Sequence, residues 1–240
     1  MKTIAIVQAR MGSTRLPKKV MMKINGTPMI ELLLKRLFHS KELDQIVLAT
    51  STDKNNTPLV KHVQHLGFDC LCGSENDVLK RYADVIKKYN AEIVVRITGD
   101  CPLIDPLLVD ECIKVFKESK IDYLCNVNPP TFPDGLDIQV TSAAALLDAD
   151  LNSKDVFDRE HVMPFIVNSK KYKSMSFKYK EDLSTNRWTV DEDRDFFLIE
   201  QIYNHFHPNI YFSWLDVLDL KYKKPDIFEV NKDITRNEGA

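Results

Sequence analysis

Short apolar segments alternate with helical patterns along the first 125 residues of the chain. We predict strands at residues 4–7, 46–49, 68–71, 93–97 and 123–125. Several of these segments are apolar on both faces, as the strands of a buried parallel sheet are. Between them, apolar residues recur at the spacing of one helical face within residues 29–38, 78–89 and 108–115. This alternation predicts right-handed β–α–β connections and a doubly wound, mostly parallel α/β sheet of the Rossmann-like kind.

The pattern changes after residue 126. A turn-rich segment containing three prolines comes first, at Pro129, Pro130 and Pro133. Beyond it we predict strands at 136–140, 173–179 and 187–190, and helices at 158–167 and 192–203. Apolar and polar residues alternate in the second of these strands, which is typical of an antiparallel strand.

These patterns indicate one domain over residues 1–240. Its first half, about residues 1–125, is regular, and its second half, about residues 126–230, adds a small antiparallel elaboration. The polar segment 231–240 is expected to be mobile.

Composition narrows the possible functions. The 240 residues are 44% hydrophobic and 28% charged, with a formal net charge of −2, which is ordinary for a soluble globular protein. A neutral balance gives no basic surface for nucleic acid and no polybasic anchor for a membrane. The N-terminal apolar run meets Arg10 too early for a signal peptide, so we expect a cytoplasmic protein. The five cysteines lack zinc-site spacing and are expected to be reduced and structural.

The loop after the first predicted strand carries the strongest chemical signal. Residues 9–19 read ARMGSTRLPKK, with four cations, two hydroxyls and a single glycine, Gly12. A ligand of an open α/β sheet binds beyond the carboxyl ends of the strands, where this loop lies. Such a loop can surround a polyphosphate, although it matches neither the P-loop nor the dinucleotide pattern. A solvated basic loop is the alternative.

Two further strand ends carry carboxylates, at Asp100 and at Asp191. Mg²⁺ takes one or two protein carboxylates together with substrate phosphates, so these two residues are a candidate magnesium site. Each also has a structural alternative. Asp100 would cap a helix beginning near Pro106, and the acidic run after Asp191 would complement the dipole of the following helix. Asp195 or its neighbour Asp193 fits that second role.

Taken together, these segments resemble the cytidylyltransferases of the acylneuraminate and 3-deoxy-manno-octulosonate class, and within it the spore coat polysaccharide biosynthesis protein F group. The resemblance runs from residue 4 through the DREH sequence at 158–161 to the segment around Asp191. The sequence departs from the family pattern at Lys18, where the family usually has glycine.

The resemblance implies Mg²⁺-dependent transfer of CMP from CTP to a small anionic acceptor, with release of pyrophosphate, for surface polysaccharide or glycoconjugate synthesis. The residues implied in nucleotide binding are Ala9, Arg10, Gly12, Ser13, Arg15, Lys19, Gly73, Ser74, Asp77 and Arg81, of which Arg10 and Lys19 act in catalysis together with Asp100. The 71–81 segment could equally be a helix cap at Ser74 or Asn76.

The second half, about residues 126–230, where we expect the acceptor to bind, is harder to interpret. The resemblance implies acceptor contacts at Asp137 and Gln139. Arg159 and His161 lie on one turn of a predicted helix, where they would either meet an anionic acceptor or form solvated helix pairs. The family also implies a homodimer, for which residues 128–133 or the region around Trp214 would supply an interface.

Three other functions remain open at this point. A sugar-1-phosphate nucleotidyltransferase would use another nucleoside triphosphate, but its phosphate loop is usually richer in glycine. A nucleotide-sugar glycosyltransferase would need an Asp-x-Asp motif, whereas the middle strand ends in a single Asp100. A non-catalytic binding module with this fold would have lost loop cations that this sequence keeps.

Overall fold

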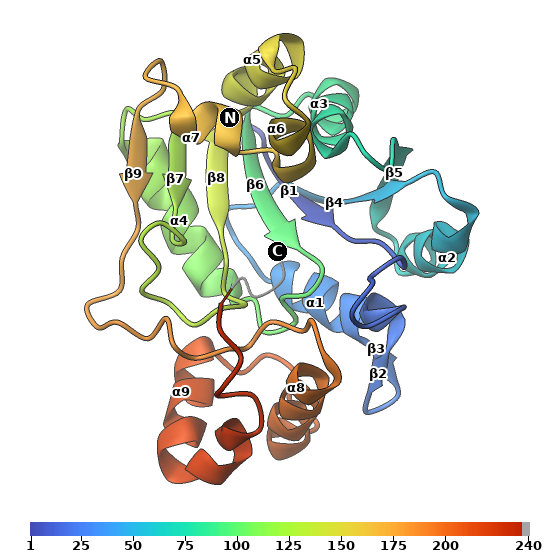
Figure 1. Cartoon of the computed structure of the whole chain (residues 1–240), viewed down its shortest axis with the longest axis vertical. Coiled ribbons are helices and arrows are strands. Elements are labelled where there is room, and N and C mark those ends of the chain that lie inside the picture. The colour runs from blue at the N-terminus through green and yellow to red at the C-terminus, as the bar shows by residue number, and fades with distance from the viewer. Residues whose placement is uncertain (237–240) are drawn as a thin grey trace.

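A computed structural model describes residues 1–236. Its centre is a seven-stranded sheet in the order β5-β4-β1-β6-β8-β7-β9, with helices on both sides (Figure 1). The strands of this sheet are β1 (Thr3–Gln8), β4 (Gln45–Ser51), β5 (Asp69–Gly73), β6 (Ile93–Thr98), β7 (Tyr123–Cys125), β8 (Gln139–Ser142) and β9 (Ser174–Ser176). A separate hairpin pairs β2 (Lys23–Ile24) with β3 (Thr27–Pro28). The mostly parallel α/β sheet expected from the sequence is thus confirmed.

The helices divide between the two faces of the sheet. They are α1 (Met29–Leu37), α2 (Thr57–His65), α3 (Val78–Tyr89), α4 (Pro106–Glu118), α5 (Ala143–Asn152), α6 (Val156–His161), α7 (Pro164–Asn168), α8 (Asp193–Phe206) and α9 (Trp214–Lys223). Ala5 and Val7 of β1 face a core with α1, α4 and α8, while Ile4 and Ile6 face a second core with α3 and α5. The sheet is buried on both faces, which is why its strands are apolar throughout. None of the helices among residues 1–236 is long and apolar enough to cross a bilayer.

The second half departs from several expectations. The helix predicted at 158–167 is two short helices, α6 and α7, because Pro164 begins a new helix and Val162 before it has a φ of 72°. Strand β9 pairs with β7 in parallel, so the expectation of an antiparallel strand at 173–179 was wrong. The antiparallel strand is β8, which lies inside the main sheet between β6 and β7.

Two segments near the C-terminus also differ. Residues 187–190 form no strand, and their β-type pairing among the described residues is an isolated parallel bridge between Asp134 and Arg187. The tail expected to be mobile packs against the domain as far as residue 236, with Asn231 and Ile234 buried; residues 237–240 lie outside the described part of the chain. Trp214, in one of the two regions suggested for a subunit interface, is itself buried within the chain beside Phe132, and the interface stays a prediction.

Candidate active site

A cavity of about 500 Å³ opens at the carboxyl ends of β1 and β6. Helices α3 and α6 contribute Val78, Arg81, Val156 and Glu160 to its other wall. Of the residues predicted for the nucleotide and metal sites, those that line the cavity are Ala9, Arg10, Ser13, Arg15, Lys19, Arg81, Asp100 and Asp191. The structure therefore brings together the three segments that the sequence singled out.

The loop after β1 is held by its own hydrogen bonds. The Met11 amide donates to Asn56 Oδ1 at 2.8 Å, and the Lys18 amide donates to the Met11 carbonyl at 3.0 Å. Lys18 itself has φ 63° and ψ 17°, the left-handed conformation that glycine adopts most easily. This explains the glycine that the family usually has at this position. The turn it makes sends the next side chain, Lys19, into the site.

Lys19 joins the two predicted metal ligands. Its Nζ donates to Asp191 Oδ1 at 2.8 Å, to Asp100 Oδ2 at 3.2 Å and to the Val190 carbonyl at 2.7 Å. Burial disfavours the ammonium, but the two carboxylates outweigh it and raise the pKa of Lys19. Burial likewise opposes ionisation of Asp100, yet Lys19 and the Thr98 hydroxyl hold the pKa of that carboxyl below its usual value. Lys19 and Asp100 are therefore both charged at neutral pH.

Backbone packing sets the separation of the two carboxylates. A Cβ on Gly99 would lie 2.6 Å from the Ala9 Cβ, so only glycine lets β6 end this close to the β1 loop. The Val190 amide donates to the Asp100 carbonyl at 2.9 Å, which draws the 188–190 segment alongside the end of β6. Asp191 thus comes to lie beside Asp100. Asp105 and not Asp100 caps α4, so the structural alternative for Asp100 is excluded.

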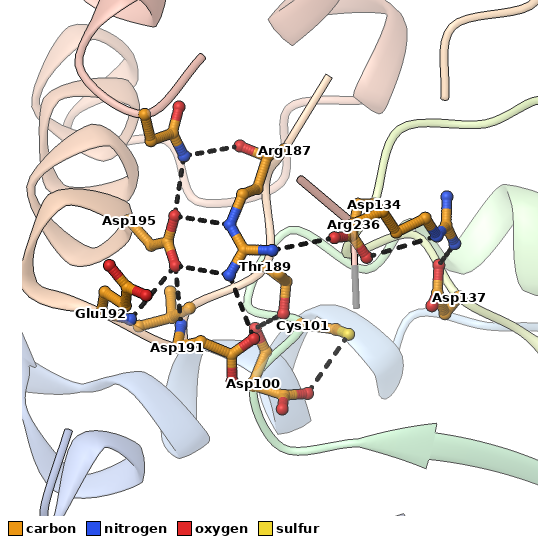
Figure 2. Close-up of polar contacts among 12 residues, drawn as sticks. Asp100, Cys101, Asp134, Asp137, Arg187, Thr189, Asp191, Glu192, Asp195 and Arg236 are labelled. Atoms are coloured by element: carbon orange, nitrogen blue, oxygen red, sulfur yellow. Dashed lines mark hydrogen bonds and ion pairs between the residues drawn. The ribbon is translucent and has the colours of Figure 1, made fainter. Parts of the chain in front are cut away.

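The two carboxylate oxygens of Asp191 contact different cationic side chains. Its Oδ1 faces Lys19 and the Arg15 guanidinium, which is 3.1 Å away. Its Oδ2 is 3.2 Å from Arg187 Nη2, a contact drawn in Figure 2. Arg187 also pairs with Asp134 and Asp195. Asp195 forms the capping box of α8 with Glu192, which is the structural role expected for this acidic run.

Two carboxylates that share one cation are a donor set that fits Mg²⁺. Within residues 1–236 no third His, Cys, Asp or Glu side chain joins Asp100 and Asp191 to complete a protein-only metal site. Mg²⁺ keeps several oxygen ligands from water and substrate phosphates, so two carboxylates suffice for it. A closed structural site of the zinc type is not formed by these residues.

Arg81 is a buried arginine, two of whose guanidinium nitrogens have no hydrogen-bond partner in the described part of the chain. The residue is 2% exposed, it lines the cavity, and its Nε and Nη1 have no hydrogen-bond acceptor among the described residues. Burial lowers its pKa. Its side chain packs over Gly73, where a Cβ would lie 2.7 Å from the Arg81 Cγ. Buried donors of this kind are normally satisfied, so Arg81 has the features of a ligand-binding group.

Several other predicted nucleotide residues lie outside the cavity lining. Gly73 makes room for Arg81, and Gly12 is exposed with open space around it. Asp77 caps α3 by accepting from the Lys80 amide at 3.0 Å, and Ser74 Oγ accepts from the Asp77 amide at 3.2 Å. The cap of α3 is therefore Asp77, neither Ser74 nor Asn76.

The predicted acceptor residues are dispersed. Arg159 pairs with Asp77 at 2.9 Å and with Asp150 at 2.8 Å, which ties α6 to α3 and α5. His161 packs against Phe157 in a tilted arrangement, with ring centroids 4.3 Å apart.

The two acceptor residues of the second half have partners of their own. Gln139 accepts from Arg96 Nη1 at 2.7 Å and donates to the Tyr123 hydroxyl at 2.7 Å, and Asp137 pairs with Arg236 at 2.6 Å. None of the four predicted acceptor residues lines the cavity, and their contact with an acceptor stays a prediction.

Sequence reasoning missed Arg187 and Arg236. Arg187 was placed in a predicted strand, although its spacing of four and eight residues from Asp191 and Asp195 is a signal that charged partners follow it. Arg236 lies in the tail that was expected to be mobile. It donates to Asp137 Oδ1 and to the Phe132 carbonyl.

Comparison with known proteins identifies the family of this chain. A family model described as cytidylyltransferase matches residues 4–216. The spore coat polysaccharide biosynthesis protein SpsF of Bacillus subtilis is 30% identical over 92% of this chain and 94% of its own length. A 3-deoxy-manno-octulosonate cytidylyltransferase of Geobacter sulfurreducens is 31% identical over 50% of this chain and 47% of its own length.

A solved structure is also similar across the whole chain. The cytidylyltransferase from Leptospira borgpetersenii is 31% identical, with a TM-score of 0.92 over 99% of this chain and 100% of that one. The chain belongs to the cytidylyltransferase family, and it is a nucleotidyltransferase enzyme. Its similarity to SpsF extends over nearly the full length of both proteins.

Proposed function

We propose that this enzyme transfers CMP from CTP to a small anionic acceptor and releases pyrophosphate. The observation that carries the proposal is the triad of Lys19, Asp100 and Asp191 at the carboxyl edge of the sheet. It puts a buried cation and two carboxylates in one cavity with the cationic loop of residues 10–19. Phosphoryl-type transfer depends mainly on positioning and on neutralising charge, and these groups supply both.

The loop cations would act on the leaving group. An acceptor oxygen attacks the α-phosphorus of CTP, and the bond from that phosphorus to the bridging oxygen of pyrophosphate breaks. Arg10, Arg15 and Lys19 neutralise the charge that gathers on the departing pyrophosphate. Ser13 adds a hydroxyl to the same wall. Arg81, on the opposite wall, offers its two unpaired donors to the nucleotide.

Asp100 and Asp191 would hold Mg²⁺. The ion supplies a Lewis acid that neutralises phosphate charge. Asp100 is kept ionised by Lys19 and Thr98, and Asp191 is oriented by cations on both of its oxygens. Asp100 would thus accept a cation without a change of protonation state, and Asp191 would present a carboxylate oxygen of fixed orientation.

The acceptor is proposed to be a sugar acid or a phosphorylated small molecule, in surface polysaccharide or glycoconjugate synthesis. The names of SpsF and of the 3-deoxy-manno-octulosonate enzyme support this class. We further propose a homodimer, on the family resemblance alone.

Thermal unfolding with five nucleotides, each with and without Mg²⁺, tests the donor and the metal. Saturation at a hundred times Kd adds about 2.7 kcal/mol, which is roughly a 5–10 °C rise for a chain of this size. We expect a Mg²⁺-dependent rise with CTP and little with ATP, GTP, UTP or dTTP. A rise with GTP or UTP alone would indicate a sugar-1-phosphate nucleotidyltransferase instead.

Pyrophosphate release with a panel of sugar acids and sugar phosphates then tests the reaction. Lys19→Met should lower turnover by about a hundred- to a thousandfold, which is the usual cost of one such electrostatic contact. Lys23→Met removes an exposed lysine of the adjacent hairpin and should leave turnover unchanged. Equal turnover in both variants would exclude Lys19 from the reaction.

A further inference from the structure

Arg187 holds the proposed metal ligand Asp191 from behind. The Arg187 side chain is 4% exposed and contacts three carboxylates, those of Asp195, Asp191 and Asp134 (Figure 2). We infer that Arg187 is a positioning residue that turns the Asp191 carboxylate so that Oδ1 faces the cavity and is available to Mg²⁺. This inference rests on the proposed function, because it assumes that Asp191 binds the metal.

The guanidinium is fixed in place by Asp195. Two parallel hydrogen bonds join them, Nε to Oδ1 at 2.9 Å and Nη2 to Oδ2 at 2.9 Å. Asp195 is fully buried, and it also accepts from the backbone amides of Asp191 and Glu192 and from the Asn231 side chain at 2.8 Å. A bidentate pair of this kind leaves the planar guanidinium one orientation.

That orientation decides how Asp191 is presented. Arg187 Nη2 lies 3.2 Å from Asp191 Oδ2, whereas Oδ1 faces Lys19 at 2.8 Å and Arg15 at 3.1 Å. Lys19 and Arg15 both line the cavity, and Arg187 is buried behind it. The two oxygens of Asp191 therefore point in different directions, one into the cavity and one toward the protein interior.

Neither charge nor stability alone accounts for this arrangement. Asp195 already gives Arg187 a bidentate carboxylate partner through two hydrogen bonds, and the contact with Asp191 is an additional one. A lysine keeps the positive charge but lacks the planar fork of donors that binds both oxygens of Asp195 in parallel and reaches Asp191 from the same group. Partners that orient a metal ligand commonly change metal affinity ten- to a hundredfold when they are replaced.

The test measures how CTP affinity depends on free Mg²⁺. Isothermal titration calorimetry gives the Kd of CTP at a series of free Mg²⁺ concentrations for the wild type, Arg187→Lys, Asp191→Asn and Asp134→Asn. Mg²⁺ should lower the Kd of CTP, and the measured quantity is the free Mg²⁺ concentration at which this decrease reaches half of its maximum. We expect Arg187→Lys to raise that concentration by about tenfold or more. Asp134→Asn is the matched control, since Asp134 contacts the same guanidinium at 3.3 Å but not Asp191. It should shift that concentration by less than about twofold.

The outcomes separate this inference from the proposed function. If Asp191→Asn keeps the Mg²⁺ dependence of the wild type, the metal assignment fails, and the inference fails with it. If Asp191→Asn loses that dependence while Arg187→Lys keeps it unchanged, the inference alone is overturned. An equal shift in Arg187→Lys and Asp134→Asn would also overturn it, because general loosening would then suffice.

A second variant applies if Arg187→Lys does not fold. Asn231→Ala removes one hydrogen bond from Asp195 and leaves every charged group in place. We expect the half-maximal Mg²⁺ concentration to rise by a smaller factor, about two- to threefold, because Asp195 then holds Arg187 less rigidly. An unchanged Mg²⁺ dependence in a folded Asn231→Ala protein would count against the positioning role.

Discussion

Replacing Arg81 with methionine should stabilise the free protein and weaken its binding of CTP. Arg81 is 2% exposed, and two of its nitrogens lack an acceptor among residues 1–236. An unsatisfied buried donor costs about 1–3 kcal/mol. Methionine keeps an unbranched side chain over Gly73 and carries no donor. We therefore expect the free energy of unfolding without nucleotide to rise by about 1–3 kcal/mol, or roughly 2–4 °C in Tm per kcal/mol.

On the role proposed for Arg81, the same change removes hydrogen bonds to CTP. A hydrogen bond to a charged group contributes about 1.5–3 kcal/mol, so the Kd of CTP should rise by roughly ten- to a hundredfold. Urea unfolding gives the stability and calorimetry gives the affinity. A variant that is less stable than the wild type and binds CTP equally well would refute the reasoning, because Arg81 would then be a structural residue.

Arg36 supplies the matched control. It is also buried, at 1% exposure, but its guanidinium donates to four carbonyl oxygens, those of Leu103, Ile104, Ile210 and Phe212. Arg36→Met should therefore lower stability by about 3 kcal/mol or more, since these acceptors lose a charged donor, and should leave the CTP affinity of the folded protein unchanged.

Three further predictions concern the backbone and the charge network. Lys18→Gly should change stability by less than about 1 kcal/mol in urea unfolding, and in the stabilising direction, because relief of the left-handed conformation offsets the entropy of glycine. Gly99→Ala should destabilise by about 1–3 kcal/mol and weaken CTP binding in calorimetry, because the new Cβ meets Ala9. Burial and Asp137 raise the pKa of Asp134 to about 6, above its unfolded value, so this group favours folding below pH 4 and that contribution is lost as pH rises through 6. In urea unfolding, the free energy of unfolding of Asp134→Asn should rise by roughly 2–3 kcal/mol relative to that of the wild type between pH 4 and pH 7. A difference between the two proteins that does not change with pH would contradict the raised pKa.

The regular half of the fold could be predicted because its strands are buried on both faces. Strand β1, for example, sends Ile4 to one core and Ala5 to the other, so an unbroken apolar run identifies it. The direction of β9 could not be predicted in this way. Alternation shows that a strand has one buried face, but the neighbour with which it pairs is decided by tertiary contacts.

The candidate site likewise contains some residues that could be predicted from the sequence and others that could not. The position of Asp100 follows from a general rule, because ligands bind at the carboxyl edge of a parallel sheet. The cap of α3 and the division between α6 and α7 depend on local backbone geometry. Of these two features, the division is indicated in the sequence by Pro164, since proline interrupts a helix. The role of Arg187 could not be predicted from its sequence neighbours alone, because one of its partners, Asp134, lies 53 residues earlier in the chain.

The reach of Lys19 has a consequence for how the enzyme is made. Its contacts with Val190 and Asp191 join positions 171 and 172 residues apart. A chain emerging from the ribosome completes β1, β4 and β6 long before residue 191 is synthesised, and contacts over such distances form late because a large loop must close first. The carboxyl edge of the nascent sheet is therefore exposed without Asp191, and the candidate site gains its full set of charged groups only after residue 191 has been synthesised.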